Sequence, residues 1–227
     1  MKTKLNYSLI SFALISIFFF VCNRTWSQAP EKPLAIIAYY MGDGSNITDY
    51  KTEKLTHIIY SFLHLKGNKL AVDNATDSIA ITRLVALKKT NPKLKIILSL
   101  GGWGGCKTCS EVFNTEDGRI EFAQSALALF KTYNADGLDL DWEYPSLESV
   151  AGHQYLPEDK QNFTLLVKTL RQTVGAGYEL SFAAGGFSQY LKSSVEWEKV
   201  MPLVNYVNLM SYDLVNGNST QTGHLTS

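Results

Sequence analysis

The sequence predicts an α/β protein built as a TIM-type (β/α)8 barrel, present here as about six of its eight βα units. Three observations favour this fold. Short apolar runs alternate with amphipathic segments, most of these runs are continuous as in parallel strands buried on both faces, and polar or glycine-rich residues follow them. An open doubly wound sheet is the competing architecture. It usually carries a phosphate-binding glycine loop after its first strand, and residues 41–45 (Met-Gly-Asp-Gly-Ser) match that loop too weakly.

The expected strands, in order, are residues 34–40, 56–65, 95–100, 135–143, 178–184 and 206–213. Helical periodicity separates most of them. One helix is marked by Ile81, Leu84 and Val85, a second by Ile120, Ala123, Leu127 and Phe130, and a third by Phe163, Leu166, Val167, Leu170 and Val174. A fourth, shorter helix is expected at residues 193–204. Barrels of this type run to ~250 residues, so the sequence is expected to stop inside the barrel.

Residues 1–27 have the features of a secretory signal peptide, because Lys2 and Lys4 precede an apolar run at residues 9–21 and cleavage fits after Ser27. A membrane anchor is the alternative, but ~13 apolar residues fall short of the ~20 that a spanning helix needs. Cys22 lacks the small residues before it that a lipoprotein site prefers. The catalytic domain would then be residues 28–227, extracellular, or periplasmic in a bacterium. Its 18 basic and 21 acidic residues give no indication of nucleic-acid binding.

Two cysteines, Cys106 and Cys109, lie in a glycine-rich segment at residues 101–109. In an exported protein this spacing favours a disulfide over a redox pair. A structural zinc site would need two further ligands, and none of the four histidines forms a cluster with the pair in the sequence. We therefore expect a disulfide and no metal.

The most informative stretch is residues 136–145, Asp-Gly-Leu-Asp-Leu-Asp-Trp-Glu-Tyr-Pro. On a β-strand, Asp139, Asp141 and Glu143 would all point the same way. Carboxylates in such a row lie ~6–7 Å apart and raise one another's pKa in a site of low dielectric constant. A solvent-facing strand would ordinarily mix in Lys, Thr and Ser, so three acids in register favour a catalytic array. Asp136 falls outside the row, and we expect a structural role for it.

Residues 136–143 match the DxxDxDxE signature of glycoside hydrolase family 18, the chitinases. Residues 99–102 (Ser-Leu-Gly-Gly) match the family's second motif, and residues 210–213 (Met-Ser-Tyr-Asp) resemble the motif at the end of its sixth strand. This resemblance implies hydrolysis of β-1,4-linked N-acetylglucosamine in chitin and chitooligosaccharides, with retained stereochemistry and attack by the substrate's own 2-acetamido group. No cofactor is implied.

The resemblance also implies roles for the site residues. Glu143, last in the row and nearest the strand end, is expected to be the acid. Asp141 would orient the acetamido group and stabilise developing positive charge, and Asp139 would share a proton with Asp141. Tyr212 would hold the acetamido oxygen. Ser99 is expected to hydrogen-bond the buried aspartates, and Gly101 and Gly102 to allow close backbone approach. The residues expected to line the substrate site at the barrel mouth are Asp213, Met210, Trp103, Tyr144, Tyr39 and Phe62.

Two other functions stay open at this point. One is an endo-β-N-acetylglucosaminidase acting on N-glycans, and the other is an inactive, lectin-like fragment that binds chitin. The presence of Glu143 favours an enzyme, because lectin relatives generally lose the acid. The family's last-strand tryptophan and its cleft insertion would both follow Ser227. Oligomeric state and endo or exo action are not determined by the sequence.

Overall fold

The computed structural model describes residues 34–213, 215, 219–224 and 226. The signal peptide predicted at residues 1–27 lies outside the described residues. The chain divides into two units, Met1–Leu34 and Ala35–Ser227, and all the helices and strands given below belong to the second. Within the described ranges, no helix combines the length and the apolar character that crossing a membrane requires.

Six parallel strands form the sheet, in the order β1-β2-β4-β5-β6-β7. They are β1 (Ile37–Tyr40), β2 (His57–Lys66), β4 (Lys95–Gly101), β5 (Gly137–Asp141), β6 (Glu179–Gly185) and β7 (Tyr206–Met210). All six predicted strands are confirmed, with ends that differ by up to three residues. A seventh, β3 (Lys69–Ala71), pairs antiparallel with the end of β2 and was not predicted. This strand has three residues and buries only its central leucine, so its sequence lacks the apolar pattern that predicts a strand.

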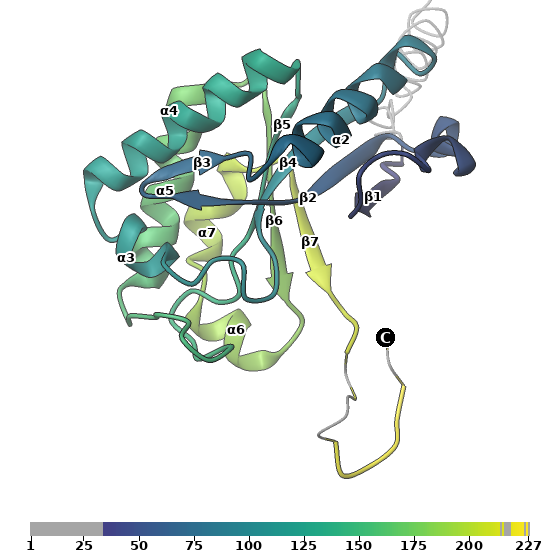
Figure 1. Ribbon diagram of the computed structural model, residues 1–227. Coiled ribbons are helices and arrows are strands. Elements are labelled where there is room, and N and C mark those ends of the chain that lie inside the picture. Colours follow the sequence, from purple (N-terminus) through teal and green to yellow (C-terminus); the bar gives the residue numbers. More distant parts are fainter. Residues whose placement is uncertain (1–33, 214, 216–218, 225, 227) are drawn as a thin grey trace, which may run out of the picture. The chain divides into compact units, whose positions relative to one another are not determined.

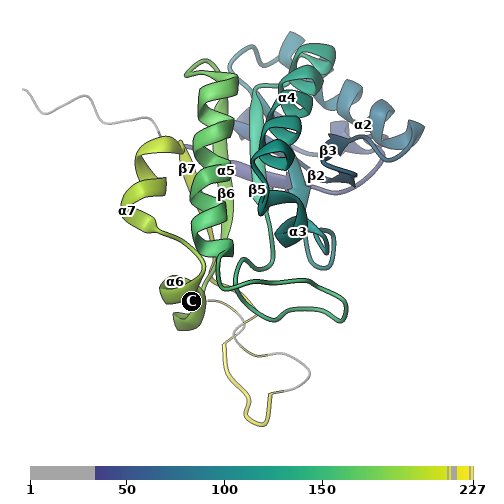
Figure 2. The same ribbon diagram turned by 90° about the vertical axis from the view of Figure 1, so that its left-hand side faces the viewer.

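The three long helices pack side by side on one face of the sheet (Figures 1 and 2). They are α2 (Ala75–Ala86), α4 (Glu116–Tyr133) and α5 (Asp159–Val174). Asn74 caps α2 by accepting hydrogen bonds from two backbone N–H groups, and Thr115 caps α4 by accepting one from the N–H of Gly118. The prediction for α4 is wrong at one position. Ile120 is 37% exposed, because the buried stripe of this helix follows Arg119, Phe122, Ala123, Ala126 and Phe130.

Short helices complete this face and its ends. They are α3 (Cys109–Phe113), α6 (Ser188–Ser193) and α7 (Trp197–Val200), with 3-10 turns at Ile47–Asp49, Thr52–Lys54, Leu87–Lys89 and Met201–Leu203. The helix predicted at residues 193–204 is shorter than predicted, because α7 continues directly into the 3-10 turn Met201–Leu203 and helical residues span only 197–203. Pro202 lies in the first turn of that 3-10 segment, where its missing N–H is tolerated.

The sheet is strongly curved, and side chains from its two outermost strands meet across the concave face. Asn208 of β7 donates a hydrogen bond to the hydroxyl of Tyr39 of β1 at 3.1 Å. Nearer the amino ends of the strands, Nε2 of His57 on β2 lies 2.8 Å from a carboxylate oxygen of Glu179 on β6. These cross-strand contacts and the all-parallel order identify an incomplete TIM barrel, as predicted.

The two ends of the strands differ in chemistry. Strands β6 and β7 point to the end where α6 and the long loops gather (Figure 1). Asp136 lies at the opposite end, just before β5, where its carboxylate accepts a hydrogen bond from the N–H of Ile96 at 2.7 Å and pairs with Lys88 at 2.5 Å. Asp136 therefore ties the amino end of β5 to its surroundings, away from the acidic row.

Candidate active site

Strand β5 presents its alternate residues to opposite faces, as the sequence predicts. Leu138, Leu140 and Trp142 are buried in the apolar core. Asp139 and Asp141 point to the concave face, and Glu143 follows two residues after the strand ends. The strand β5 is shorter than predicted. Asp141 pairs with Gly101, which is the last residue of β4, so β4 offers no partner for the residues of the chain that follow Asp141. All three acids are buried, with exposed fractions of 0%, 5% and 8% for Asp139, Asp141 and Glu143.

Asp139 is the most heavily hydrogen-bonded of the acids. Its Oδ2 accepts from the hydroxyls of Tyr39 at 3.0 Å and Ser99 at 2.9 Å. Its Oδ1 accepts from the hydroxyl of Ser181 at 2.6 Å and the amide of Asn208 at 3.1 Å. Four donors from strands β1, β4, β6 and β7 therefore converge on one carboxyl group. Burial raises the pKa of Asp139, and these hydrogen bonds oppose the rise by favouring the ionised form.

Asp141 has a different environment. Burial, then the charge of Glu143, then that of Asp139, raise its pKa to about 8. Its Oδ1 is buried without a hydrogen-bond partner among the described residues. Burial raises the pKa of Asp139 as well, so each of the two neighbouring carboxyl groups favours a bound proton.

Glu143 lies nearest to the open end of the site. Burial is the main cause that raises the pKa of its carboxyl group, and the negative charge of Asp213 adds to the rise. The hydroxyl of the neighbouring Tyr144 hydrogen-bonds this carboxyl and acts in the opposite direction. The net effect raises the pKa of Glu143, which is the direction that a general acid requires.

The carboxyl groups of Asp141 and Glu143 open into a cleft of about 670 Å³. The cleft is rich in aromatic residues: Trp103 is 65% exposed, its ring centroid lies 6.4 Å from that of Tyr144, and Tyr144 lies 5.3 Å from Phe187. Exposed aromatic faces of this kind suit the apolar faces of sugar rings. The residues that line the cleft are Phe62, Trp103, Asp141, Glu143, Tyr144, Phe187, Met210, Tyr212 and Asp213.

One predicted cleft residue has a different place. Tyr39 does not line the cleft. Its hydroxyl donates a hydrogen bond to Asp139 instead, because β1 places this side chain beside the carboxyl group of Asp139, the acid furthest from the cleft. Phe187, in turn, lines the cleft and was not predicted.

A family model for glycosyl hydrolases family 18 matches residues 35–227, which is most of the chain. The chain belongs to glycosyl hydrolase family 18. It is 34% identical to Chitinase B of Serratia marcescens over 232 residues, covering 93% of this chain and 44% of that protein. It is 40% identical to Chitinase A1 of Niallia circulans over 156 residues, covering 65% of this chain and 22% of that protein.

The structure gives the same result. The chitinase domain of the spore coat protein CotE from Clostridium difficile superposes with a TM-score of 0.78 at 31% identity, covering 88% of this chain and 56% of that one. This family 18 chain spans less than half the length of the two curated relatives.

Two glycines of this family 18 site permit the close packing that the sequence predicts. Gly101 has φ of 108°, and a Cβ on it would collide with the backbone oxygen of Asp141. Gly102 has φ of 78°, and a Cβ there would lie 2.6 Å from the ring of Phe62. The N–H of Gly102 donates to the carbonyl of Asp141 at 2.9 Å. These glycines therefore join the end of β4 to the end of β5.

We expect Gly102→Ala to lower the free energy of unfolding by ~2–3 kcal/mol, since it combines a positive φ with a collision against Phe62. Gly152→Ala is the matched control: Gly152 has φ of 82° and nothing within 4 Å of the added Cβ, so it should cost only ~1 kcal/mol. Urea unfolding of both variants measures the difference. Equal losses would mean that the Phe62 contact does not limit this position.

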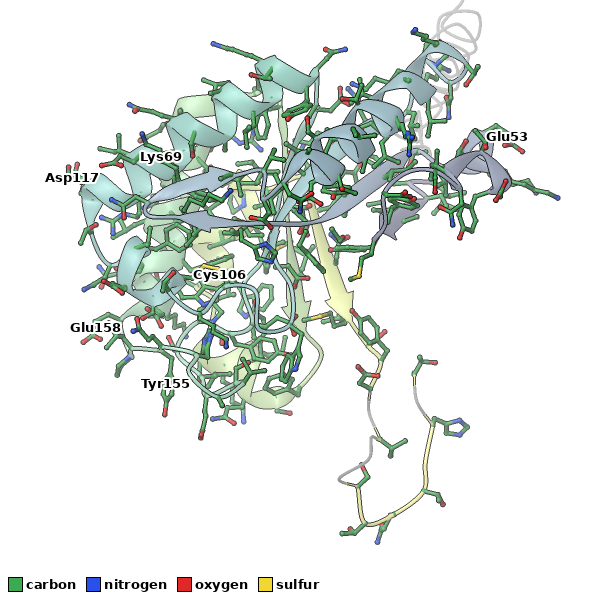
Figure 3. All side chains as sticks on the ribbon, viewed as in Figure 1. Glu53, Lys69, Cys106, Asp117, Tyr155 and Glu158 are labelled. Atoms are coloured by element: carbon green, nitrogen blue, oxygen red, sulfur yellow. A yellow bond between two sulfur atoms is a disulfide. The ribbon has the colours of Figure 1, made fainter. Side chains whose placement is uncertain are left out.

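The loop after β4 contains a disulfide between Cys106 and Cys109, both buried. Figure 3 labels Cys106, whose sulfur lies beside the loops at the carboxyl end of the sheet. The pair joins the start of α3 to the segment that carries Trp103, so it restrains one wall of the cleft.

Ser181 and Asn208, which both donate to Asp139, were not among the predicted site residues. A signal for each was present. Asn208 lies two residues before Met210 on the same strand, and Ser181 lies directly opposite Asp139 in the parallel register of β5 and β6. Alternation along a strand would therefore have placed both side chains on the concave face, but neither is an acid or an aromatic residue.

Proposed function

We propose that this chain carries the acidic site of a chitinase, which hydrolyses β-1,4-linked N-acetylglucosamine in chitin and chitooligosaccharides with retained stereochemistry. One observation carries the proposal: three buried carboxyl groups in a row end at Glu143, whose pKa is raised, at the floor of an aromatic cleft. Family membership and relatives named as chitinases support it.

Glu143 is the general acid in this proposal. Cleavage of a glycosidic bond requires a proton on the leaving oxygen, and a carboxyl group kept protonated near neutrality supplies it. After departure of the leaving sugar, the same group as a carboxylate removes a proton from the water that hydrolyses the intermediate. Glu143 lies at the end of the row that faces the cleft, so it can reach both the leaving oxygen and the water.

The substrate's 2-acetamido oxygen is the nucleophile in this proposal, and Asp141 is its partner. Oδ1 of Asp141 is buried and lacks a protein partner among the described residues, which is costly unless a ligand group pairs with it. An acetamido N–H fits this requirement. As positive charge develops on the attacking acetamido group, the Asp139–Asp141 pair, which would share one proton, stabilises it with its remaining negative charge. Sugars without an N-acetyl group, such as cello-oligosaccharides, should therefore be poor substrates.

The remaining cleft residues hold the sugars. Tyr212 would donate to the acetamido oxygen, and Asp213 would contact the sugar at the cleavage point. Trp103 and Phe187 present exposed rings on which sugar faces can stack. Because Tyr39 donates to Asp139, we assign it to the support of the row rather than to sugar binding.

The raised pKa of Asp141, about 8, predicts how stability and activity depend on pH. The folded state holds this proton more tightly than the unfolded state, whose carboxyl has an ordinary pKa. The contribution of Asp141 to the free energy of unfolding should therefore fall as pH rises from about 4 to about 8. We expect kcat/KM for chitotetraose to fall above pH ~8, where Asp139 and Asp141 would both be charged.

Two measurements check this prediction: a pH–rate profile from pH 4 to 10, and urea unfolding across the same range. Asp141→Asn has no proton to lose, so its free energy of unfolding should decline less steeply with pH than that of the wild type. An identical slope in both proteins would contradict the proposed titration of Asp141.

The experiment that tests the function is product release from chitotetraose, compared with cellotetraose and with a high-mannose N-glycan. Release from chitotetraose alone would support a chitinase. Release from the N-glycan alone would favour an endo-β-N-acetylglucosaminidase, and binding without release would favour a lectin-like function.

We also propose that the protein is exported through the signal peptide expected at residues 1–27. A disulfide in the cleft wall is consistent with an oxidising compartment. Cleavage after Ser27, detected by amino-terminal sequencing of the protein recovered outside the cytoplasm, would support export, and an intact Met1 would contradict it.

A further inference from the structure

Residues 146–158, between β5 and α5, form a loop at the carboxyl end of the sheet (the 146–158 loop). Its two ends are tied to one buried carboxylate. Oδ2 of Asp159 accepts from the N–H of Ser146 at 3.2 Å and from that of Leu156 at 2.8 Å. Oδ1 of Asp159 accepts from the hydroxyl of Ser110 on α3 at 2.7 Å. The loop therefore has a fixed base, so a side chain within it can be held at a defined place.

One side chain of this loop turns back to the site. Nε2 of His153 lies 3.0 Å from the carbonyl oxygen of Tyr144 and 3.3 Å from its backbone nitrogen. A protonated Nε2 donates to the carbonyl, and an unprotonated Nε2 accepts from the N–H, so either tautomer holds the same residue. The next residue adds a second tie, because the N–H of Gln154 donates to the carbonyl of Lys107 at 3.1 Å in the loop that carries Trp103.

Tyr144 directly follows Glu143, and its hydroxyl hydrogen-bonds the Glu143 carboxyl group. Movement of the Tyr144 backbone would shift both the acid and the hydroxyl that holds it. Neither residue belongs to β5, which ends at Asp141. The direction of the acid therefore depends on contacts outside the sheet, and His153 supplies the side-chain contact to the Tyr144 backbone.

We propose that His153 is a positioning residue for Glu143: by binding the backbone of Tyr144, it fixes the direction in which the acid meets the glycosidic oxygen. The proposal rests on the proposed function of Glu143. It gives the 146–158 loop a part in the reaction. This role could not be predicted from the sequence, because His153 belongs to no motif and to no apolar pattern.

The test compares His153→Ala, His153→Gln and the control Gln154→Ala. Gln keeps a donor and an acceptor in the side chain, whereas Ala removes both. Gln154 is exposed, and its hydrogen bond to Lys107 is made by its backbone N–H, which alanine retains. Steady-state kinetics on chitotetraose give kcat and KM, and urea unfolding gives stability. Amide hydrogen exchange at Tyr144 reports by NMR on an accepting Nε2, and the carbonyl carbon chemical shift of Tyr144 reports on a donating one.

In His153→Ala we expect kcat to fall on the order of tenfold to a hundredfold with KM nearly unchanged, since a misdirected acid affects the chemical step more than binding. Exchange at the Tyr144 N–H should be roughly tenfold faster. His153→Gln should recover most of both losses, and Gln154→Ala should show neither.

Three results would overturn the proposal: unchanged exchange together with unchanged backbone chemical shifts at Tyr144 in His153→Ala, a fall in kcat that only follows the loss of stability, or no recovery in His153→Gln. Failure of the wild-type chain to release product would contradict the proposed function instead. In that case the exchange comparison would still decide whether His153 holds the Tyr144 backbone.

Discussion

Glu143→Gln is expected to lower the turnover of chitotetraose by roughly 10²–10⁴-fold while leaving its affinity nearly unchanged. The amide keeps the size and shape of the carboxyl group, and it can still accept the hydrogen bond of the Tyr144 hydroxyl. It has no acidic proton to give to the leaving oxygen. Initial rates give the loss of turnover, and isothermal titration calorimetry with chitotetraose gives the affinity.

Glu148→Gln is the matched control for this variant, because Glu148 is an exposed acid five positions along the chain. It should behave as the wild type. If Glu143→Gln lost affinity and turnover in parallel, Glu143 would have a structural role, and the assignment of the acid would have to be abandoned.

Asp141→Asn is expected to have the second largest effect, a loss of kcat of roughly 10²–10³-fold. An asparagine has no acidic proton to pass to Asp139, so it cannot become a carboxylate as positive charge develops on the acetamido group. It also removes the repulsion between two acids, so the variant should be at least as stable as the wild type near pH 8, where the Asp141 charge is most costly. Asp49→Asn, at an exposed acid, is the control.

The two variants should respond differently to the leaving group. An aryl chitobioside releases a phenolate that needs little help from an acid, so Glu143→Gln should recover much of its rate on that substrate. Asp141→Asn should not recover, because the acetamido group still has to attack. Equal recovery in both variants would show that their roles are not distinct.

Much of the fold could be predicted from the sequence, because parallel strands buried on both faces produce continuous apolar runs and their register follows from the barrel. The acidic row was predicted from alternation alone, and Asp139 and Asp141 do share a face. The sequence did not predict where β5 ends, and therefore which of the three acids lie on the strand. Whether β5 continues to Glu143 depends on where β4 ends, and a single strand's sequence does not contain its neighbour's length.

Residues that act through neutral polar groups were harder to find. Ser181 lies directly opposite Asp139 on the neighbouring strand. Asn208 is two strands away and meets Asp139 only because the sheet curves, which is a property of all six strands together. His153 reaches Tyr144 through a loop whose path is set by the buried Asp159. Tyr39 was expected at the barrel mouth, but the level of its hydroxyl is set by the register of β1 against β2.

The convergence of four strands on Asp139 limits how this site could be moved to another protein. A designer who transplanted only residues 136–145 would bring a buried carboxyl group without Tyr39, Ser99, Ser181 and Asn208, and a buried charge without donors is costly. The transplant would also need hydrogen-bond donors on the host's other strands, at positions level with the transplanted carboxyl group. The ten-residue signature is thus a marker by which the site is found, whereas the smallest portable unit is a cross-section through the barrel.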